Sequence, residues 1–350
     1  MTTHNLALVG LNFGRHLLKD FTPGGSAFPF FHLAAVCDLN EALARRYGEE
    51  CGVPWTTSLD QLLADDSIAA IALLTGPVGR AALVDKITAA GKHIMTTKPF
   101  EADPEAAFIL NTARARGFTV LMNSPQPVET RADLQLIQRW REQFSLGEPI
   151  SAHSETWASY REKADGSWYD DPSKCPVAPL FRLSIYALND LVALFGGVES
   201  ASVMATRRFT ERPTPDTANA LLSFQNGMLV SLFASFCIDD TEPYQDSMVL
   251  HFERGTIYRN GMRAARGQGT GETMLDLVCP QGGQRTVLHE NLSSKGGDYP
   301  WERLHQAVSG GTPAGLPDPE RVAEALRVID ALRRAEASGA TEPVIHPAGK

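Results

Sequence analysis

The sequence predicts an α/β protein of two domains. The first is a doubly wound parallel sheet; the second is an α+β domain with a large, mostly antiparallel open sheet. Up to residue 123, apolar runs and helical segments alternate about six times, which is typical of a doubly wound sheet. Beyond it, strand-like runs follow one another too closely for helical crossovers. Because 350 residues exceed one ordinary core, we expect domains at 1–123 and 124–350.

Composition narrows the functional classes. The net charge of −9 argues against a nucleic-acid partner, whose phosphates require a basic face. No run of roughly 18 apolar residues predicts a membrane span, and an apolar strand begins too early to leave room for a signal peptide. The five scattered cysteines and the lack of Cys-x-x-Cys or His-x-x-x-His pairs predict no metal site and a reducing, cytoplasmic location.

The first expected strand, 6–9, ends at a glycine turn. Gly10-Leu11-Asn12-Phe13-Gly14-Arg15 then opens a short helix. Glycines let a backbone approach a pyrophosphate, and a helix N-terminus offers N–H groups to it. The pattern is a shortened dinucleotide fingerprint, with Asn12 at the middle glycine position. Similar glycine turns also occur in other α/β proteins.

The second expected strand, 32–37, ends in Asp38, a suitable position for a carboxylate that binds an adenosine ribose. The alternative is that Asp38 only caps the helix expected at 41–50. Leu39 and Asn40 follow, so a 2′-phosphate would find no cation there. NAD is therefore favoured over NADP.

Further apolar runs at 68–74, 93–96 and 118–122 also end in polar residues. Helices are expected between them at 78–90 and from Asp103 to Arg116. Strand ends of a parallel sheet share one edge, where ligands bind. Pro99 restricts the backbone at Lys98. A lysine at this edge could take part in catalysis; the alternative is an ordinary surface lysine in a loop. The candidate cofactor-binding residues are Gly10, Asn12, Phe13, Gly14, Asp38, Thr75, Gly76, Thr97, Lys98 and Asn123.

In the second domain we expect helices at 129–144, 180–195, 301–309 and 319–338, and strands at 150–157, 200–208, 218–224, 228–236, 248–252, 256–260, 275–279 and 285–288. Asn226-Gly227 predicts a type I′ hairpin. The glycine-rich segment 264–272 is expected to be a mobile loop and the C-terminal tail to fray. The apolar row Val230, Leu232, Ala234 and Phe236 predicts a covered face, and hence a homodimer or homotetramer.

The helix expected at 180–195 carries a polar stripe formed by Arg182, Tyr186, Asn189 and Asp190. It faces either a cleft or solvent. If Arg182 lies near a reacting hydroxyl, it favours an anionic substrate. The alternative is an ion pair with Asp190, Asp170 or Asp171. Trp157, Tyr160 and Trp168 could stack on a sugar ring or pack in a core.

The chain resembles the Gfo/Idh/MocA family, the glucose–fructose oxidoreductase and inositol dehydrogenase group, over nearly its whole length. The resemblance rests on the glycine turn, Asp38, Thr97-Lys98-Pro99, Trp168-Tyr-Asp-Asp171-Pro172 and Ile185-Tyr186-Ala-Leu-Asn189. It implies a Rossmann domain followed by an α/β domain with a large open sheet. It also implies that Lys98 is the catalytic lysine and that Tyr186 holds the family's tyrosine or histidine position.

Three departures from the family pattern are visible. Thr97 replaces the usual glutamate, a glycine triplet is missing before Leu180, and Arg182 replaces an aspartate. The resemblance implies an NAD-dependent dehydrogenase that acts on a sugar or cyclitol, with Lys98 and Tyr186 catalytic. We expect Trp168, Arg182, Asn189 and Asp190 at the substrate, and Arg182 adds sugar acids to the candidate substrates. The alternatives are a non-catalytic NAD-binding regulator and a hydrolase or lyase with tightly held NAD.

Overall fold

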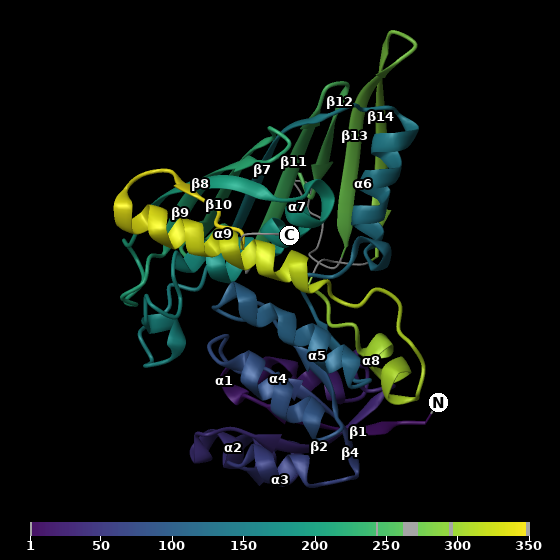
Figure 1. Cartoon of the computed structure of the whole chain (residues 1–350), viewed down its shortest axis with the longest axis vertical. Coiled ribbons are helices and arrows are strands. Elements are labelled where there is room, and N and C mark those ends of the chain that lie inside the picture. Colours follow the sequence, from purple (N-terminus) through teal and green to yellow (C-terminus); the bar gives the residue numbers. More distant parts are fainter. Residues whose placement is uncertain (1, 243, 262–271, 294–296, 348–350) are drawn as a thin grey trace. The chain divides into compact units, whose positions relative to one another are not determined.

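A computed structural model gives the structure of this protein and describes residues 2–242, 244–261, 272–293 and 297–347 (Figure 1). The chain forms two compact units. Unit 1 comprises Met1–Gln126 and Tyr299–Glu320, and unit 2 comprises Pro127–Asp298 and Arg321–Lys350. Of the loop expected at 264–272, only Glu272 lies within the described residues.

Unit 1 contains a parallel sheet, as the sequence predicts. In the described part of the chain it has six strands in the order β3-β2-β1-β4-β5-β6. The strands are β1 (His4–Val9), β2 (Phe31–Cys37), β3 (Trp55–Thr56), β4 (Ile68–Leu73), β5 (His93–Thr96) and β6 (Val120–Met122). The strand order reverses between β1 and β4, which makes that edge the topological switch point.

The helices of unit 1 largely follow the expected ranges. They are α1 (Leu11–Gly14), η1 (Arg15–Phe21), α2 (Glu41–Cys51), α3 (Leu59–Leu63), α4 (Arg80–Ala89), η2 (Pro104–Phe108), α5 (Ile109–Ala115) and α8 (Trp301–Val308). The helix expected from Asp103 begins there, since the Asp103 carboxylate accepts the Glu105 N–H. It consists of a 3₁₀ turn followed by an α-helix.

The segment Tyr299–Glu320 belongs to unit 1, whereas the sequence placed it in the second domain. The reason is packing: Trp301 and Leu304 are buried in the same apolar core as strands β1 and β2. The Trp301 ring meets the ring of Phe21 edge-on, with centroids 5.3 Å apart. A short amphipathic helix fits either core, so its sequence alone does not assign it. The N-terminal part of unit 1 ends at Gln126, three residues beyond the expected boundary.

Unit 2 contains a mostly antiparallel sheet. Its strands, nine within the described residues, follow the order β14-β13-β12-β11-β7-β10-β9-β8-β15, and only the β7–β10 pair among them is parallel. They are β7 (Pro149–Ala158), β8 (Val198–Thr206), β9 (Thr217–Phe224), β10 (Leu229–Ser235), β11 (Tyr244–Phe252), β12 (Gly255–Arg259), β13 (Thr273–Gln281), β14 (Gln284–Leu292) and β15 (Glu342–Pro343). The tail expected to fray thus adds an edge strand.

The helical elements of unit 2 are η3 (Val128–Thr130), α6 (Ala132–Gln143), η4 (Trp168–Asp170), η5 (Leu180–Ser184) and α7 (Ile185–Phe195). The long helix α9 (Pro319–Ser338) begins where the chain returns from unit 1. Helix α6 lies alongside β13 (Figure 1). The helix expected at 180–195 forms, but it begins with a π-helical turn, η5, and continues as α7.

The hairpin at Asn226-Gly227 forms, but the expected type I′ turn is wrong. Strands β9 and β10 pair so that Phe224 and Met228 flank a three-residue loop. In that loop Gly227 has a positive φ of 84°, whereas Gln225 and Asn226 do not have one. This is a type I turn followed by a left-handed glycine. The Asn226 carboxamide oxygen accepts the Met228 N–H instead.

The apolar row Val230, Leu232, Ala234 and Phe236 does not need a partner subunit. Each of these side chains is at most 2% exposed within the chain itself, and β10 packs against η5. Alternation shows which residues share a face of a strand, but not which face a helix covers. The opposite face is the exposed one, and it carries Leu221 and Leu229, each about 60% exposed.

A buried charge network joins α6, α7 and β12. The Arg131 guanidinium lies 2.8 Å from Asp133, and the Arg259 guanidinium lies 2.6 Å from Asp190. All four side chains are at most 7% exposed. Burial would lower the pKa of Arg131, but Asp190 and Asp133 outweigh that effect and raise it. Arg131, Arg259 and Asp133 therefore remain charged at neutral pH.

We expect Asp190→Asn to lower the free energy of unfolding by about 3–5 kcal/mol, because two buried guanidiniums then share Asp133 as their one remaining carboxylate partner in the network. Urea denaturation measures this. The control is Asp330→Asn, which removes the partly exposed ion pairs of Asp330 with Arg333 and Arg334 and should cost at most about 1 kcal/mol. Equal losses in the two variants would contradict the importance of the network.

Candidate active site

The glycine turn after β1 has the geometry of a dinucleotide cradle. Gly10 has a φ of +93°, and a Cβ there would lie 2.7 Å from the carbonyl carbon of Leu74. At Gly14 a Cβ would lie 2.6 Å from the Leu8 side chain. Gly10 thus permits a close approach of two backbones, and Gly14 lets α1 pack against β1. The residues present therefore fit a bound pyrophosphate at this turn.

Between the two glycines, Asn12 and Phe13 point outward. Phe13 is 36% exposed, and the Asn12 carboxamide oxygen accepts a hydrogen bond from Arg15 at 2.9 Å. Both side chains thus lie at the rim of the glycine turn, and their contact with a cofactor stays a prediction.

Asp38 binds the glycine turn rather than capping α2. One carboxylate oxygen accepts the Leu11 N–H at 2.7 Å, and the other accepts the Asn40 N–H at 2.8 Å. The cap of α2 is Asn40, whose side chain accepts from Ala42 and Leu43. The alternative assignment of Asp38 as the helix cap is therefore wrong. Each oxygen of Asp38 keeps a lone pair that can accept a ribose hydroxyl.

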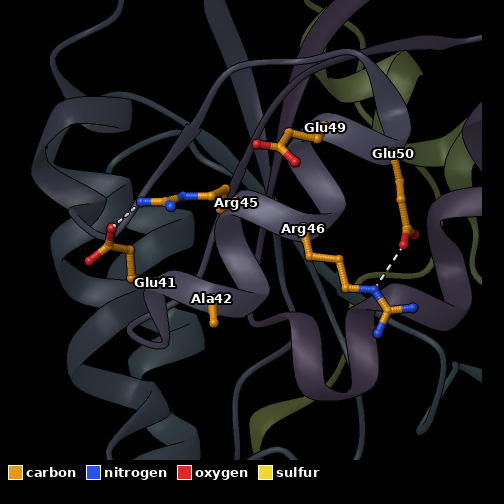
Figure 2. Close-up of a pocket in the computed structure, with 6 residues that line it drawn as sticks. All are labelled: Glu41, Ala42, Arg45, Arg46, Glu49 and Glu50. Atoms are coloured by element: carbon orange, nitrogen blue, oxygen red, sulfur yellow. Dashed lines mark hydrogen bonds and ion pairs between the residues drawn. The ribbon is translucent and has the colours of Figure 1, made fainter.

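A shallow hollow lies along the outer side of α2 (Figure 2). It is lined by Glu41, Ala42, Arg45, Arg46, Glu49 and Glu50. Arg45 pairs with Glu41 and Arg46 with Glu50, each one helical turn away, and all four side chains are at least half exposed. Exposed pairs of this kind are solvated, so the hollow is not a candidate site.

Arg80 holds the loop that carries Lys98. Its side chain is 1% exposed and donates to the carbonyls of Thr97 at 2.7 Å and Phe100 at 3.0 Å. It also donates to the carbonyls of Pro99 and Thr75. Thr75 follows β4 and Thr97 follows β5, so one guanidinium fixes the carboxyl ends of both strands.

Glu101 fastens the same loop to α4. Its carboxylate, 3% exposed, accepts the N–H groups of Gly79 at 3.0 Å and Ala81 at 2.9 Å. Gly79 has no side chain to cap α4, so Glu101 supplies the negative charge that a helix N-terminus favours. Sequence reasoning missed both Arg80 and Glu101. The available signal was an arginine directly before the apolar run at 81–84, in the first turn of the helix.

Asn123 connects Lys98 with Thr97. Its side chain is 1% exposed, and its oxygen accepts the Lys98 N–H at 3.1 Å and the Thr97 hydroxyl at 3.3 Å. A Cβ on Gly10 would lie 2.8 Å from the Thr75 nitrogen, and the Thr75 hydroxyl donates to the Gly76 carbonyl at 3.3 Å. The candidate cofactor residues of unit 1 therefore form one contiguous edge of the sheet.

In unit 2, the polar stripe of η5 and α7 divides. Asp190 belongs to the buried network described above, and Asn189 is 4% exposed. Tyr186 lies against Gly297, where a Cβ would come within 3.0 Å of its ring. Trp168 packs on Tyr169 with ring centroids 4.3 Å apart. Tyr186 and Lys98 belong to different units, so their pairing stays a prediction.

Arg182 pairs with Glu162, a partner that the sequence did not suggest. The contact is bidentate, at 2.6 and 2.7 Å, and the guanidinium stacks 3.7 Å from the centroid of the Tyr169 ring. Arg212 holds Glu162 as well, at 2.8 Å. Burial would raise the pKa of Glu162, but Arg182 and Arg212 outweigh it and lower that pKa. The charge of Arg182 is thus balanced within the chain.

The comparisons with known proteins agree with this geometry. Residues 4–124 match the oxidoreductase family with the NAD-binding Rossmann fold, and residues 134–258 match the GFO/IDH/MocA C-terminal domain. The chain belongs to the GFO/IDH/MocA family. One curated relative, the uncharacterized oxidoreductase C115.03 of Schizosaccharomyces pombe, is 27% identical over 140 residues. That alignment covers 40% of this chain and only 38% of the relative.

Solved structures of similar fold cover nearly the whole chain. Levoglucosan dehydrogenase in complex with NADH and levoglucosan is 16% identical with a TM-score of 0.74, over 99% of this chain and 100% of that one. An Agrobacterium radiobacter oxidoreductase with NAD+, L-tartaric acid and magnesium is 18% identical with a TM-score of 0.67, over 98% and 99%. At these identities the likeness is one of fold.

Two features are absent from the residues that the structure describes. No group of three or more His, Cys, Asp or Glu side chains there could hold a metal ion. In the same residues, no helix is long and apolar enough to span a bilayer.

We expect Asp38→Ala to weaken NADH binding by about 10- to 100-fold, because a charged acceptor of ribose hydroxyls is lost. NADPH binding should weaken less, and fluorescence titration measures both. The control Asn40→Ala removes the cap of α2, costs about 1 kcal/mol of stability and should leave NADH affinity unchanged. Equal effects of the two variants on NADH would contradict the assignment.

Proposed function

We propose that this protein is an NAD-dependent dehydrogenase that transfers a hydride between nicotinamide and a secondary hydroxyl or keto group. The proposed substrate class is a sugar, a cyclitol or a sugar acid. The observation that carries the proposal is the position of Lys98. Asn123 and the loop bound by Arg80 hold Lys98 at the same sheet edge as Gly10. A cytoplasmic location, which the sequence predicts, is part of the proposal.

The cofactor contacts follow from unit 1. The turn from Gly10 to Gly14 would hold the pyrophosphate, with Asn12 and Phe13 at its rim, and Asp38 would hold the adenosine ribose. Thr75, Gly76, Thr97 and Asn123 would line the nicotinamide side of the edge. Bound NAD would supply the hydride acceptor, or as NADH the donor. NADP is disfavoured because Asp38 places a negative charge at the ribose.

Proton transfer is assigned to two side chains. Oxidation of an alcohol releases a hydroxyl proton, and Tyr186 accepts it as the general base. A phenol titrates near ~10 in water, and a nearby ammonium stabilises its phenolate. Lys98 supplies that ammonium. In the reverse direction Lys98 polarises the carbonyl and Tyr186 donates the proton; the two roles could also be exchanged.

The balanced charge of Arg182 bears on substrate choice. Because Glu162 already neutralises this guanidinium, we favour a neutral sugar or cyclitol over a sugar acid. A neutral anhydro sugar, levoglucosan, is bound in the structurally similar levoglucosan dehydrogenase. Trp168 and Asn189 remain the proposed substrate contacts, whereas the place of Asp190 in the buried network favours a structural role.

The exposed face of the unit 2 sheet supports self-association. Leu221 and Leu229 lie on neighbouring strands β9 and β10, and Met204 on β8 is 83% exposed. Apolar side chains grouped on one sheet face favour a protein partner. We therefore propose that a homodimer or homotetramer forms through this face.

Lys98→Met and Tyr186→Phe should each abolish turnover while leaving NADH affinity within about threefold, because both remove proton handling and neither removes a pyrophosphate or ribose contact. Turnover is measured with neutral polyols, uronates and aldonates, and affinity by NADH fluorescence. Lys163→Met, at an exposed lysine, is the control. Unchanged turnover in Lys98→Met would refute the assignment. NADH binding without turnover of any substrate by the native protein would favour a non-catalytic regulator.

Sedimentation at micromolar concentration should show a dimer or tetramer. Leu221→Lys should shift the population toward monomer, because it places a charge in the middle of the proposed contact. The control is Leu39→Lys, since Leu39 is 92% exposed and belongs to unit 1, so it is not part of that sheet face. A native protein that sediments only as a monomer would overturn the oligomer proposal.

A further inference from the structure

The chain passes from unit 2 to unit 1 through Gly297, Asp298 and Tyr299. We propose that this segment positions both catalytic groups, Tyr186 through Gly297 and Lys98 through Tyr299. The roles of Lys98 and Tyr186 belong to the proposed function, on which this inference rests. The segment itself touches no reacting atom in the proposal, so its residues are positioning residues.

At the first end, the main chain lies against the Tyr186 ring. A Cβ on Gly297 would lie 3.0 Å from Cε1, 3.5 Å from Cζ and 3.6 Å from the hydroxyl oxygen of Tyr186. Gly297 also has a φ of +93°, a conformation that favours glycine. The backbone therefore limits the ring on the side that carries its hydroxyl, and a side chain larger than glycine would displace it.

At the second end, Tyr299 closes a chain of hydrogen bonds that leads to Lys98. The Tyr299 hydroxyl donates to the Thr97 hydroxyl at 2.9 Å. The Thr97 hydroxyl donates to the Asn123 oxygen, which also accepts the Lys98 N–H. Thr97 is 5% and Asn123 1% exposed, so little water competes for these bonds.

The position of Tyr299 is set by the core of unit 1. Its ring stacks on Trp301 with centroids 5.7 Å apart and an interplanar angle of 21°. Trp301 is 2% exposed in the core around β1 and β2. The hydroxyl of Tyr299 is therefore presented to Thr97 by a fixed ring rather than by a mobile side chain.

Only Asp298 separates the two contact residues. Consecutive Cα atoms lie about 3.8 Å apart, so the segment has little slack. One short connection thus makes both contacts: Gly297 with Tyr186 in unit 2, and Tyr299 with Thr97 in unit 1.

The Lys98 end is tested with Tyr299→Phe, which deletes one hydroxyl and keeps the stack on Trp301. We expect kcat to fall by about 10- to 100-fold with a smaller change in KM, because a small misplacement of a catalytic group is costly. Without any substrate, the rate at which acetic anhydride labels Lys98 should change several-fold relative to Lys163. Thr97→Val added to Tyr299→Phe should cause little further loss. Tyr47→Phe, on α2, is the control and should change none of these.

The Tyr186 end is tested with Gly297→Ala. Ultraviolet titration of phenolate, taken as the difference from Tyr186→Phe, should show a shifted Tyr186 ionisation, and the pH profile of kcat should shift with it. The control is Gly310→Ala, which has a φ of +84° but nothing within 4 Å of the added Cβ. It carries similar backbone strain without touching Tyr186.

Unchanged Lys98 labelling in Tyr299→Phe, or the same titration in Gly297→Ala and Gly310→Ala, would overturn the inference. Failure of the proposed function gives a different result: Lys98→Met or Tyr186→Phe would then retain turnover. The labelling and titration experiments need no turnover, so they decide the positioning role in either case.

Discussion

The candidate active site depends on one buried guanidinium. Arg80 is 1% exposed and donates to four carbonyls in the turns after β4 and β5. A planar group with five donors is suited to this task, and its loss would leave buried carbonyls unsatisfied. Glu101 binds the start of the same helix through the Gly79 and Ala81 N–H groups. The position of Lys98 is therefore a consequence of how α4 begins.

In unit 2, too, buried charged side chains hold parts of the chain together. Asp190 lies between two buried arginines, and Arg182 lies between Glu162 and an aromatic ring. Both residues share a helical stripe with Tyr186, and in a sequence they look equally suited to face a substrate. The structure shows that their charges are balanced internally. Tyr186 is the third titratable group of the stripe, and it is the one to which the proposed function assigns proton transfer.

The features that depend on local sequence pattern could be predicted from the sequence. Alternation and strand ends gave the parallel sheet, and they placed Gly10, Asp38 and Lys98 correctly on it. Glu162 as the partner of Arg182 could not be predicted, because that pairing depends on how distant loops fold. The assignment of 299–320 failed for the same reason: an amphipathic helix does not specify which core it joins. The turn after β9 shows that a hairpin can be predicted when its turn type cannot, since one Asn-Gly pair fits two turn types.

Thr97 replaces the glutamate that the family resemblance leads one to expect next to the lysine. An ionised carboxylate only accepts hydrogen bonds, whereas a hydroxyl both accepts and donates. Thr97 uses both capacities, accepting from Tyr299 and donating to Asn123. The substitution also removes a negative charge next to Lys98, and that charge would offset part of the ammonium's effect on a nearby phenol. Under the proposed roles, the threonine thus keeps the lysine loop in place without offsetting the positive charge of Lys98.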